Sequence, residues 1–213
     1  MNLLLKKLKE EYPEAQSGLY FTNPLETLIA VLLSAQCRDE RVNKVTKTLF
    51  AKYPDVEAYA KAEQEDLEKD LLSLGLYRNK AKNIRLLAKE IVQRFSKEVP
   101  SSLDGLMSLP GVGRKTALCV LQEAYGKVLG VAVDTHVARL SQRLGLTENS
   151  DRIKIEKDLK KRIPKKEWAL ANHLFIAHGR KICDSRRPRC SDCVLSVHCL
   201  YQKKKAGEKK IAK

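Results

Sequence analysis

The residues from Leu109 to Asp134 constrain the fold of this chain more than any other stretch. They begin with LPGVG (109–113), whose proline and two glycines favour a tight turn over a continuing helix. A helical segment follows, so its free N–H groups and the positive end of its dipole face the turn. The sequence therefore predicts a helix, a hairpin and a second helix, with an anion site formed by the backbone of Gly111 and Gly113.

Lys115 and Asp134 are the two chemically distinctive side chains of this stretch. Lys115 lies in the first helical turn, where the dipole and the adjacent Arg114 disfavour a positive charge and favour the neutral amine, a nucleophile. Asp134 follows the apolar residues 131–133 and is predicted to cap the next helix. Non-catalytic DNA-binding modules contain similar hairpins. In such a module Lys115 would only contact a phosphate and Asp134 would only cap.

LPGVGRKTA, followed by VAVDTH, resembles the helix-hairpin-helix and Gly/Pro–Asp motif of the endonuclease III family of HhH-GPD DNA glycosylases. The hairpin, the lysine and the aspartate have the order and spacing of that family, and the resemblance covers nearly the whole chain. It implies an all-α fold of two lobes. One is a helical barrel, residues 18–129, with the helix-hairpin-helix at about 101–127. The other is discontinuous, residues 1–17 and 130–213, and holds a [4Fe-4S] cluster.

The composition points to the same class of partner. The chain has 41 Lys and Arg residues against 26 Asp and Glu, a net charge of +15, which predicts binding to nucleic acid. An apolar content of 43% is sufficient for a packed core. The sequence shows neither a signal peptide nor an apolar run long enough to cross a membrane. We therefore expect a cytoplasmic, nucleoid-associated monomer that does not bind membranes.

Apolar residues at helical spacing predict the main helices. Residues 25–35 are apolar on nearly every side and should form a central buried helix that begins at Asn23-Pro24. Residues 54–73 predict two short helices, and residues 79–95 predict one long helix. No stretch alternates with the two-residue period of a strand, and residues 128–133 are interpreted as a connector. The residues themselves thus also indicate an all-α fold.

Four of the six cysteines lie close together in the pattern C-x6-C-x2-C-x5-C. Because a reducing cytoplasm opposes disulfides, this grouping indicates a metal site. The spacing alone fits zinc and an iron–sulfur cluster equally. The resemblance to the endonuclease III family, whose [4Fe-4S] loop is similarly spaced, implies the cluster. The expected ligands are Cys183, Cys190, Cys193 and Cys199.

Basic side chains accompany the cysteine group. Arg186, Arg187 and Arg189 lie between its first two members and would either contact DNA phosphates or balance the charge of the thiolates. Arg139 and the residues 178–180 are candidates to donate N–H groups toward the sulfurs. The two remaining cysteines, Cys37 and Cys119, are expected to be buried apolar residues.

The resemblance also implies a substrate and a reaction. The substrate is double-stranded DNA that contains damaged bases, oxidised pyrimidines in particular, or abasic sites. The damaged nucleotide leaves the base stack, and Lys115 attacks C1′ of its sugar and expels the base. The resulting Schiff base permits β-elimination, which cuts the strand. Asp134 would help to deprotonate Lys115 or stabilise the positively charged transition state.

Further residues receive roles through the resemblance. Gln36 and Leu76 match the residues that fill the gap left by the extruded nucleotide and wedge the duplex, although a polar helix end and an apolar loop residue would account for them equally simply. Asp39 matches an acidic active-site position, but it is an equally good candidate to cap the next helix. His136 is a possible active-site residue, although we expect a structural role for it rather than a catalytic one. Gly111, Gly113 and Arg114 would contact the DNA backbone.

Two positions depart from the family pattern. Arg38 replaces a small polar residue beside the proposed base pocket, which bears on the choice of damaged base, and Leu118 replaces an asparagine farther from the chemistry. Two alternatives remain. One is a monofunctional mismatch glycosylase, a class that usually lacks the lysine. The other is a non-catalytic, metal-stabilised helix-hairpin-helix module that binds DNA without cutting it.

Overall fold

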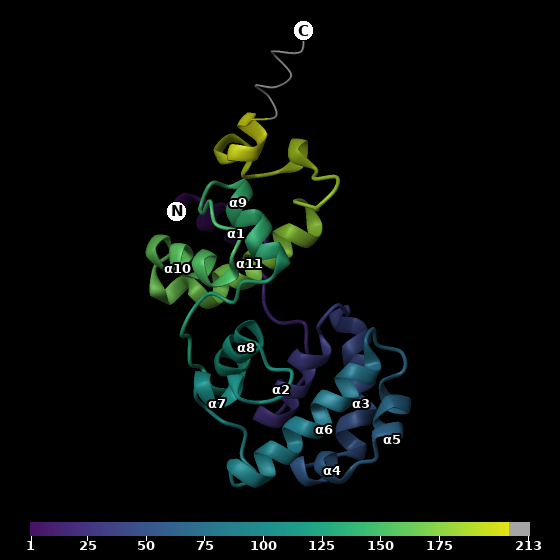
Figure 1. Cartoon of the computed structure of the whole chain (residues 1–213). Coiled ribbons are helices and arrows are strands. Elements are labelled where there is room, and N and C mark those ends of the chain that lie inside the picture. The colour runs from purple at the N-terminus through teal and green to yellow at the C-terminus, as the bar shows by residue number, and fades with distance from the viewer. Residues whose placement is uncertain (205–213) are drawn as a thin grey trace. The chain divides into compact units, whose positions relative to one another are not determined.

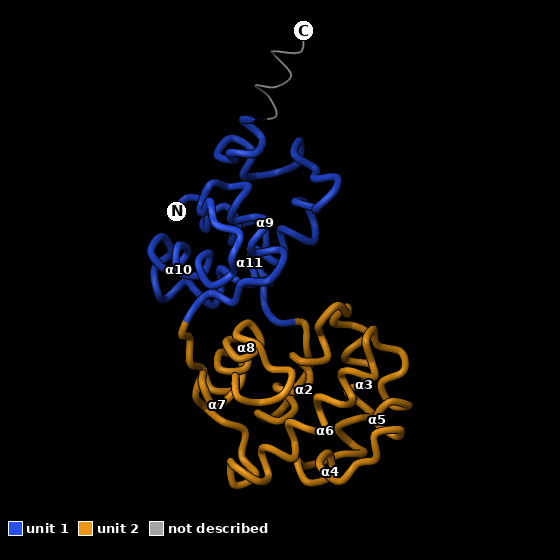
Figure 2. Tube along the Cα trace, in the orientation of Figure 1, with its two compact units in different colours: residues 1–17, 130–213 blue, residues 18–129 orange. Residues whose placement is uncertain are grey.

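The computed structural model describes residues 1–204, and all regular structure in that part of the chain is helical (Figure 1). The all-α prediction is confirmed, and the connector at residues 128–133 contains no strand. The chain divides into two compact units (Figure 2). Unit 1 comprises Met1–Ser17 and Gly130–Lys213, and unit 2 comprises Gly18–Leu129. The final residues of the range 130–213, from 205 onward, lie outside the described residues.

Unit 2 is built from consecutive helices connected by short turns. As predicted, two short helices occupy the range 54–73, and one long helix follows them. The helices are α2 (Pro24–Leu33), α3 (Asp39–Lys52), α4 (Val56–Lys61), α5 (Gln64–Leu71), α6 (Tyr77–Arg94), α7 (Leu103–Met107) and α8 (Arg114–Tyr125).

Helix α2 is the central helix of unit 2. Its N-cap Asn23 accepts a hydrogen bond from the backbone N–H of Glu26, and Pro24 occupies the first helical position, as the sequence predicts. Every residue from Thr27 to Leu33 is buried. Helices α3, α6 and α8 pack against it. Each buried leucine or isoleucine stabilises this core by roughly 1.5–3 kcal/mol.

The start of helix α3 contradicts the prediction that Asp39 caps it. The N-cap position is held by Arg38, whose side chain makes no capping hydrogen bond, and Asp39 is already the first helical residue. The capping role predicted for Asp39 is therefore wrong. Its carboxylate instead lies in the first turn, where the positive end of the helix dipole favours it.

Unit 1 surrounds helix α11. The long helices of this unit are α1 (Asn2–Glu11), α9 (Thr135–Arg143), α10 (Arg152–Arg162) and α11 (Trp168–Lys181). Helices α1 and α9 pack against α11, whose Leu174 and Phe175 are fully buried. Short 3-10 turns lie at Lys165–Glu167 before α11 and at Cys190–Asp192 and Ser196–His198 after it, and residues 200–204 are helical. No helix in residues 1–204 is long and apolar enough to cross a lipid bilayer.

The hairpin between α7 and α8 is held by its apolar residues and by one close backbone contact. Leu109 and Val112 are buried, while the two glycines are exposed. Gly111 has φ +77°, which a side chain disfavours. An added Cβ there would lie 2.7 Å from Nδ2 and 2.8 Å from Cγ of Asn83 on α6. Both the backbone angle and the space therefore require glycine.

Gly111→Ala should lower the free energy of unfolding by about 1–3 kcal/mol, because the new Cβ is strained and meets Asn83. The measurement is urea unfolding followed by circular dichroism. Gly113→Ser is the matched control, since no atom lies within 4 Å of an added Cβ there. Serine is also a good N-cap, so this change should cost less than about 0.5 kcal/mol. Equal losses in the two variants would contradict this account of the hairpin.

Candidate functional site

The hairpin of unit 2 leads directly into α8. Gly113 is the N-cap of that helix, with φ −85°, and Arg114 is its first residue, as the sequence predicts. Lys115 lies in the first turn and is half-buried. Because Gly113 has no side chain, no side-chain cap covers the first N–H groups of α8. This end of α8 thus combines an uncapped first turn, a positive dipole and an amine.

Asp134 is the N-cap of α9 in unit 1, so its predicted capping role is confirmed. Its Oδ1 accepts hydrogen bonds from the backbone N–H groups of His136 and Val137, each at 2.8 Å. The second carboxylate oxygen takes no part in this cap. A capping role and a chemical role are therefore compatible for this side chain. Lys115, in contrast, belongs to unit 2.

Gln36 and Leu76 share an unusual backbone conformation. Their φ angles are +57° and +59°, in the left-handed region, which costs an ordinary residue about 1–2 kcal/mol. Both side chains are exposed. The two turns are neighbours, because an added Cβ at Gly75 would lie 3.8 Å from the carbonyl oxygen of Gln36. Strained, exposed residues of this kind often mark functional positions.

Asp39 and His136 are each packed against a glycine. An added Cβ at Gly18 would lie 2.9 Å from Oδ2 of Asp39, so the backbone of residue 18 covers one side of this half-buried carboxylate. An added Cβ at Gly179 would likewise lie 2.9 Å from Nδ1 of His136.

The surroundings of His136 favour a neutral ring. Nη2 of Arg139 lies 3.0 Å from Nδ1 of His136. Burial lowers the pKa of His136, and the charges of Arg139 and Arg180 lower it further, against the opposing effect of Asp134. The neutral imidazole thus accepts a hydrogen bond from Arg139. His136 is therefore held in the packing between α9 and α11.

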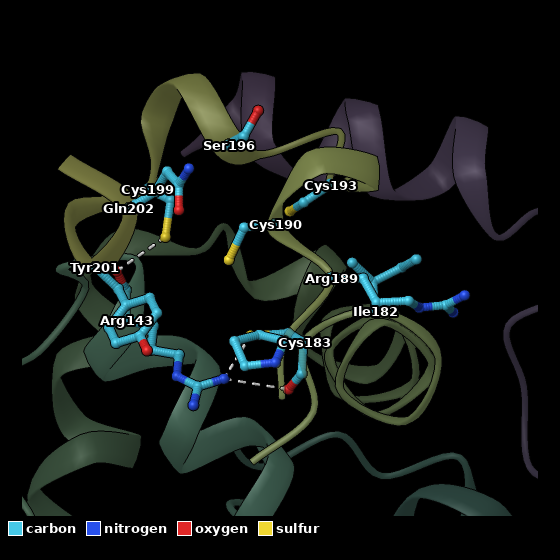
Figure 3. A pocket seen from close by; sticks show the side chains of 11 residues that line it. Arg143, Ile182, Cys183, Arg189, Cys190, Cys193, Ser196, Cys199, Tyr201 and Gln202 are labelled. Atoms are coloured by element: carbon cyan, nitrogen blue, oxygen red, sulfur yellow. Dashed lines mark hydrogen bonds between the residues drawn. The ribbon is translucent and has the colours of Figure 1, made fainter. Parts of the chain in front are cut away.

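The grouped cysteines line one pocket of unit 1 (Figure 3). It encloses roughly 290 Å³, part of it open to solvent. No disulfide joins any of the cysteines in the described residues. Burial raises the pKa of Cys193, and the other three thiols raise it further. The cysteines that line the pocket are Cys183, Cys190, Cys193 and Cys199.

Arg143 on α9 makes the most extensive contacts with this loop, and the sequence did not single it out. Its Nη1 lies 3.2 Å from Sγ of Cys183 and donates to the carbonyl oxygen of Asp184 at 2.6 Å. Its Nη2 donates to the carbonyl oxygen of Ser185, and its guanidinium lies 4.8 Å from the ring centroid of Tyr201. The signal that could have revealed it is helical spacing, because Arg143 follows the predicted Arg139 by one turn.

The predicted neighbours of the sulfurs make two kinds of contact. Arg139 donates from Nε to the carbonyl oxygen of Cys183 at 3.0 Å, so it supports the loop backbone rather than a sulfur. His178 lies with Nε2 3.4 Å from Sγ of Cys193 and with Nδ1 2.9 Å from the hydroxyl of Tyr12.

Burial determines which groups carry the protons in the series from Tyr12 through His178 to Cys193. Burial raises the pKa of Tyr12 to about 12 and lowers that of His178 to about 4. The hydroxyl therefore keeps its proton and can donate to Nδ1. A neutral imidazole then carries its own proton on Nε2, which faces the sulfur of Cys193.

The three arginines of the loop differ in their surroundings. Arg186 and Arg187 have exposed side chains, and their backbone N–H groups donate to Oδ1 of Asp184 at 2.8 and 3.0 Å. These two bonds, that of Arg187 first, lower the pKa of Asp184. Arg189 instead donates from its guanidinium to the carbonyl oxygen of Lys181. Arg189 is thus connected to the end of α11.

The pocket brings four sulfurs together with the guanidinium of Arg143 and the imidazole of His178. Within residues 1–204, no three His, Cys, Asp or Glu side chains converge closely enough to hold a single ion. A zinc ion would need each sulfur at about 2.3 Å. A multinuclear cluster separates its four ligands more widely, and the cationic and N–H groups of Arg143 and His178 offset thiolate charge.

The two isolated cysteines differ from the prediction that both are buried. Cys37 and Cys119 are each half-buried. Cys119 lies against the core of unit 2. Sγ of Cys37 lies 3.2 Å from Nζ of Lys80 on α6. Cys37 therefore contacts a polar side chain and not only apolar residues.

Comparison with known proteins gives consistent results. Residues 29–165 match the family model of the HhH-GPD superfamily base excision DNA repair protein. The chain is 50% identical over 197 residues to endonuclease III of Synechocystis sp., covering 92% of this chain and 89% of that protein. It is 47% identical to endonuclease III of Bacillus subtilis, with the same coverage. A trapped endonuclease III–DNA covalent intermediate is similar in structure, with a TM-score of 0.91, 46% identity and 96% coverage of both chains.

Asp134→Ala should lower the free energy of unfolding by about 1 kcal/mol, because two backbone N–H groups lose their acceptor. Asp134→Asn keeps an oxygen at the Oδ1 position and should remain within about 0.5 kcal/mol of the unmodified protein. Urea unfolding measures both. If the asparagine variant lost as much as the alanine variant, the hydrogen bonds would not account for the contribution of this residue.

Proposed function

This chain belongs to the endonuclease III family within the HhH-GPD superfamily of base excision DNA repair proteins and is a DNA glycosylase, and we propose that it is also an abasic-site lyase. The proposed substrates are oxidised pyrimidines and abasic sites in double-stranded DNA. The observation that carries the proposal is the place of Lys115, in the first turn of α8 directly after the hairpin. A related endonuclease III is known as a trapped covalent intermediate with DNA, which supports a covalent step.

The proposed reaction uses the Lys115 amine as the nucleophile. Its nitrogen attacks C1′, and the bond between C1′ and the base breaks, so the base leaves with the electron pair and takes up a proton. The nitrogen gives up one of its two protons, the ring oxygen takes up a proton as its bond to C1′ breaks, and a protonated Schiff base then joins Lys115 to C1′. Loss of a proton from C2′ then expels the 3′ phosphate. Water finally hydrolyses the Schiff base and restores the amine.

Asp134 is proposed to assist at the proton transfers. A carboxylate can accept a proton from the attacking amine, or stabilise the positive charge that develops on the sugar. Its Oδ1 is engaged in the cap of α9. We assign the chemical role to Oδ2. The cap then also fixes the direction in which that oxygen points.

The proposed DNA contacts of unit 2 begin at the hairpin. The exposed backbone of Gly111 and Gly113, with the first N–H groups of α8, would bind a phosphate near the lesion. Arg114 would add charge there. Gln36 would occupy the space of the extruded nucleotide, and Leu76 would separate neighbouring bases. The left-handed backbone and the exposure of both residues support these roles.

The remaining assignments concern Asp39, His136 and the arginines of the cysteine loop. Asp39 is proposed as a second acidic group near the base pocket, and His136 as a packing residue of unit 1. Arg186 and Arg187, rather than Arg189, would reach DNA phosphates, since the guanidinium of Arg189 donates to the carbonyl oxygen of Lys181 at the end of α11. We further propose that the protein acts as a monomer in the cytoplasm, on the DNA of the nucleoid.

The four cysteines of unit 1 are proposed to hold a [4Fe-4S] cluster. When bound, the cluster joins four thiolates and gives the loop the cross-links that its short 3-10 turns do not provide. Arg143 would anchor the backbone beside Cys183, and His178 would direct an N–H group to the sulfur of Cys193. We give the cluster no step in the reaction above.

Lys115→Ala should abolish covalent trapping by borohydride on a duplex with one abasic site, because the Schiff base cannot form. Its affinity for DNA should change by less than about tenfold, because one phosphate contact at most is lost. Lys127→Ala is the control, a lysine beyond the other end of α8 that contacts Ser101. It should be trapped normally. Trapping that persisted in Lys115→Ala would exclude this nucleophile.

The same assay separates the alternative functions. Base release without trapping, by the unmodified protein, would indicate a monofunctional glycosylase. Salt-sensitive binding with neither base release nor trapping would indicate a DNA-binding module.

In the proposed enzyme, Asp134→Asn should slow base release about 10²- to 10⁴-fold while it keeps the cap of α9.

Cys193→Ser should reduce bound iron and the visible absorbance of the purified protein, because one of the four ligands is lost. It should also lower thermal stability, since metal binding contributes to folding. Cys119→Ser, a change outside the pocket, should retain the iron of the unmodified protein. Zinc in place of iron in protein purified without air would contradict the assignment of a [4Fe-4S] cluster.

A further inference from the structure

Lys80 is a buried lysine whose amine lies beside Gln36. Its exposed fraction is only 4%. Nζ donates to the carbonyl oxygen of Ala35 at 2.8 Å and lies 3.2 Å from Sγ of Cys37. These two residues are the immediate neighbours of Gln36 in the chain. The amine therefore holds the turn on both sides of the left-handed residue.

The surroundings of this amine are unusual for a buried lysine. Its partners are a carbonyl oxygen and a sulfur, and within residues 1–204 it forms no ion pair with a carboxylate. Burial of such a group without an opposite charge is unfavourable, and an apolar side chain would fill the same space at lower cost. The hydrogen bond at the carboxyl end of α2 offsets part of this cost. The lysine at position 80 is therefore better explained by the geometry that it gives to the turn than by a contribution to stability.

The same residue is fixed to the second turn through its backbone. The N–H of Lys80 donates to the carbonyl oxygen of Leu76 at 3.0 Å, in the first turn of α6. Gly75 lies where the two turns meet. A Cβ added to it would point at the carbonyl oxygen of Gln36 and the sulfur of Cys37. Lys80 thus connects the left-handed turn at Gln36 with the left-handed turn at Leu76.

We propose that Lys80 is a positioning residue that sets the Gln36 turn and the Leu76 turn relative to each other, so that the two side chains enter the duplex together. The inference rests on the proposed function, which gives both side chains their place in DNA. Lys80 itself does not touch the reacting atoms. Its loss should weaken the recognition of a disrupted duplex more than it weakens general DNA binding, because phosphate contacts elsewhere remain.

The test compares affinity for a duplex that contains one reduced abasic site with affinity for the intact duplex. Lys80→Met fills the same space without a donor and should lower this affinity ratio about tenfold. Lys82→Met is the matched control, because it removes a lysine that is exposed on the same helix. It should weaken both affinities equally and leave the ratio unchanged within about twofold.

A double-mutant cycle separates positioning from simple destabilisation. If Lys80 acts through Gln36, Lys80→Met should change the ratio little in a Gln36→Ala background. The same tenfold loss in that background, or equal weakening on both duplexes, would overturn the proposal. If Lys80→Met does not fold, Lys80→Gln, with a donor on a shorter stem, replaces it in the same cycle. If the unmodified protein showed no preference for the abasic duplex, both the proposed function and this inference would be refuted. If Lys115 were trapped on DNA but the affinity ratio did not change in Lys80→Met, only the inference would be refuted.

Discussion

The contact between Gly111 and Asn83 leaves no room for a Cβ atom, and this close approach fixes the hairpin against helix α6. Leu76, Lys80 and Asn83 follow one another at intervals of four and three residues, so they lie on one side of that helix. Through them α6 meets three turns: its own start, the end of α2 and the hairpin. The surface that we assign to DNA in unit 2 is therefore set by one rigid element.

The cysteine loop of unit 1 depends on the helices beside it. Regular structure in this loop is limited to short 3-10 turns, so its backbone carbonyls need partners from elsewhere. Arg139 and Arg143 supply them from α9 and hold the first cysteine and the two residues after it. His178 approaches the third cysteine from α11. The geometry of the thiols is thus prepared by side chains outside the loop.

Several features of unit 2 lower stability and are best understood through function. Gln36 and Leu76 have positive φ angles, as do Ser96 and Lys97 elsewhere in the unit, and Lys80 is buried without a carboxylate partner among residues 1–204. Natural proteins keep such features where activity requires a fixed geometry. Helix α2, which is buried along most of its length, contributes stability that offsets these unfavourable features.

The amino-acid sequence by itself determined the all-α fold, the start of α8 after the hairpin, the proline start of α2 and the cap at Asp134. These features follow from residues within one or two turns of each other, and local rules describe them well. The same local reasoning was wrong for Asp39, because the helix begins at Asp39 itself, one residue earlier than a capping aspartate would place it. The tertiary structure alone decided the contacts of Lys80 with Ala35, of Arg143 with the cysteine loop, and of Asn83 with Gly111. Their partners lie tens of residues away, and only the packing of the helices brings such side chains within bonding distance.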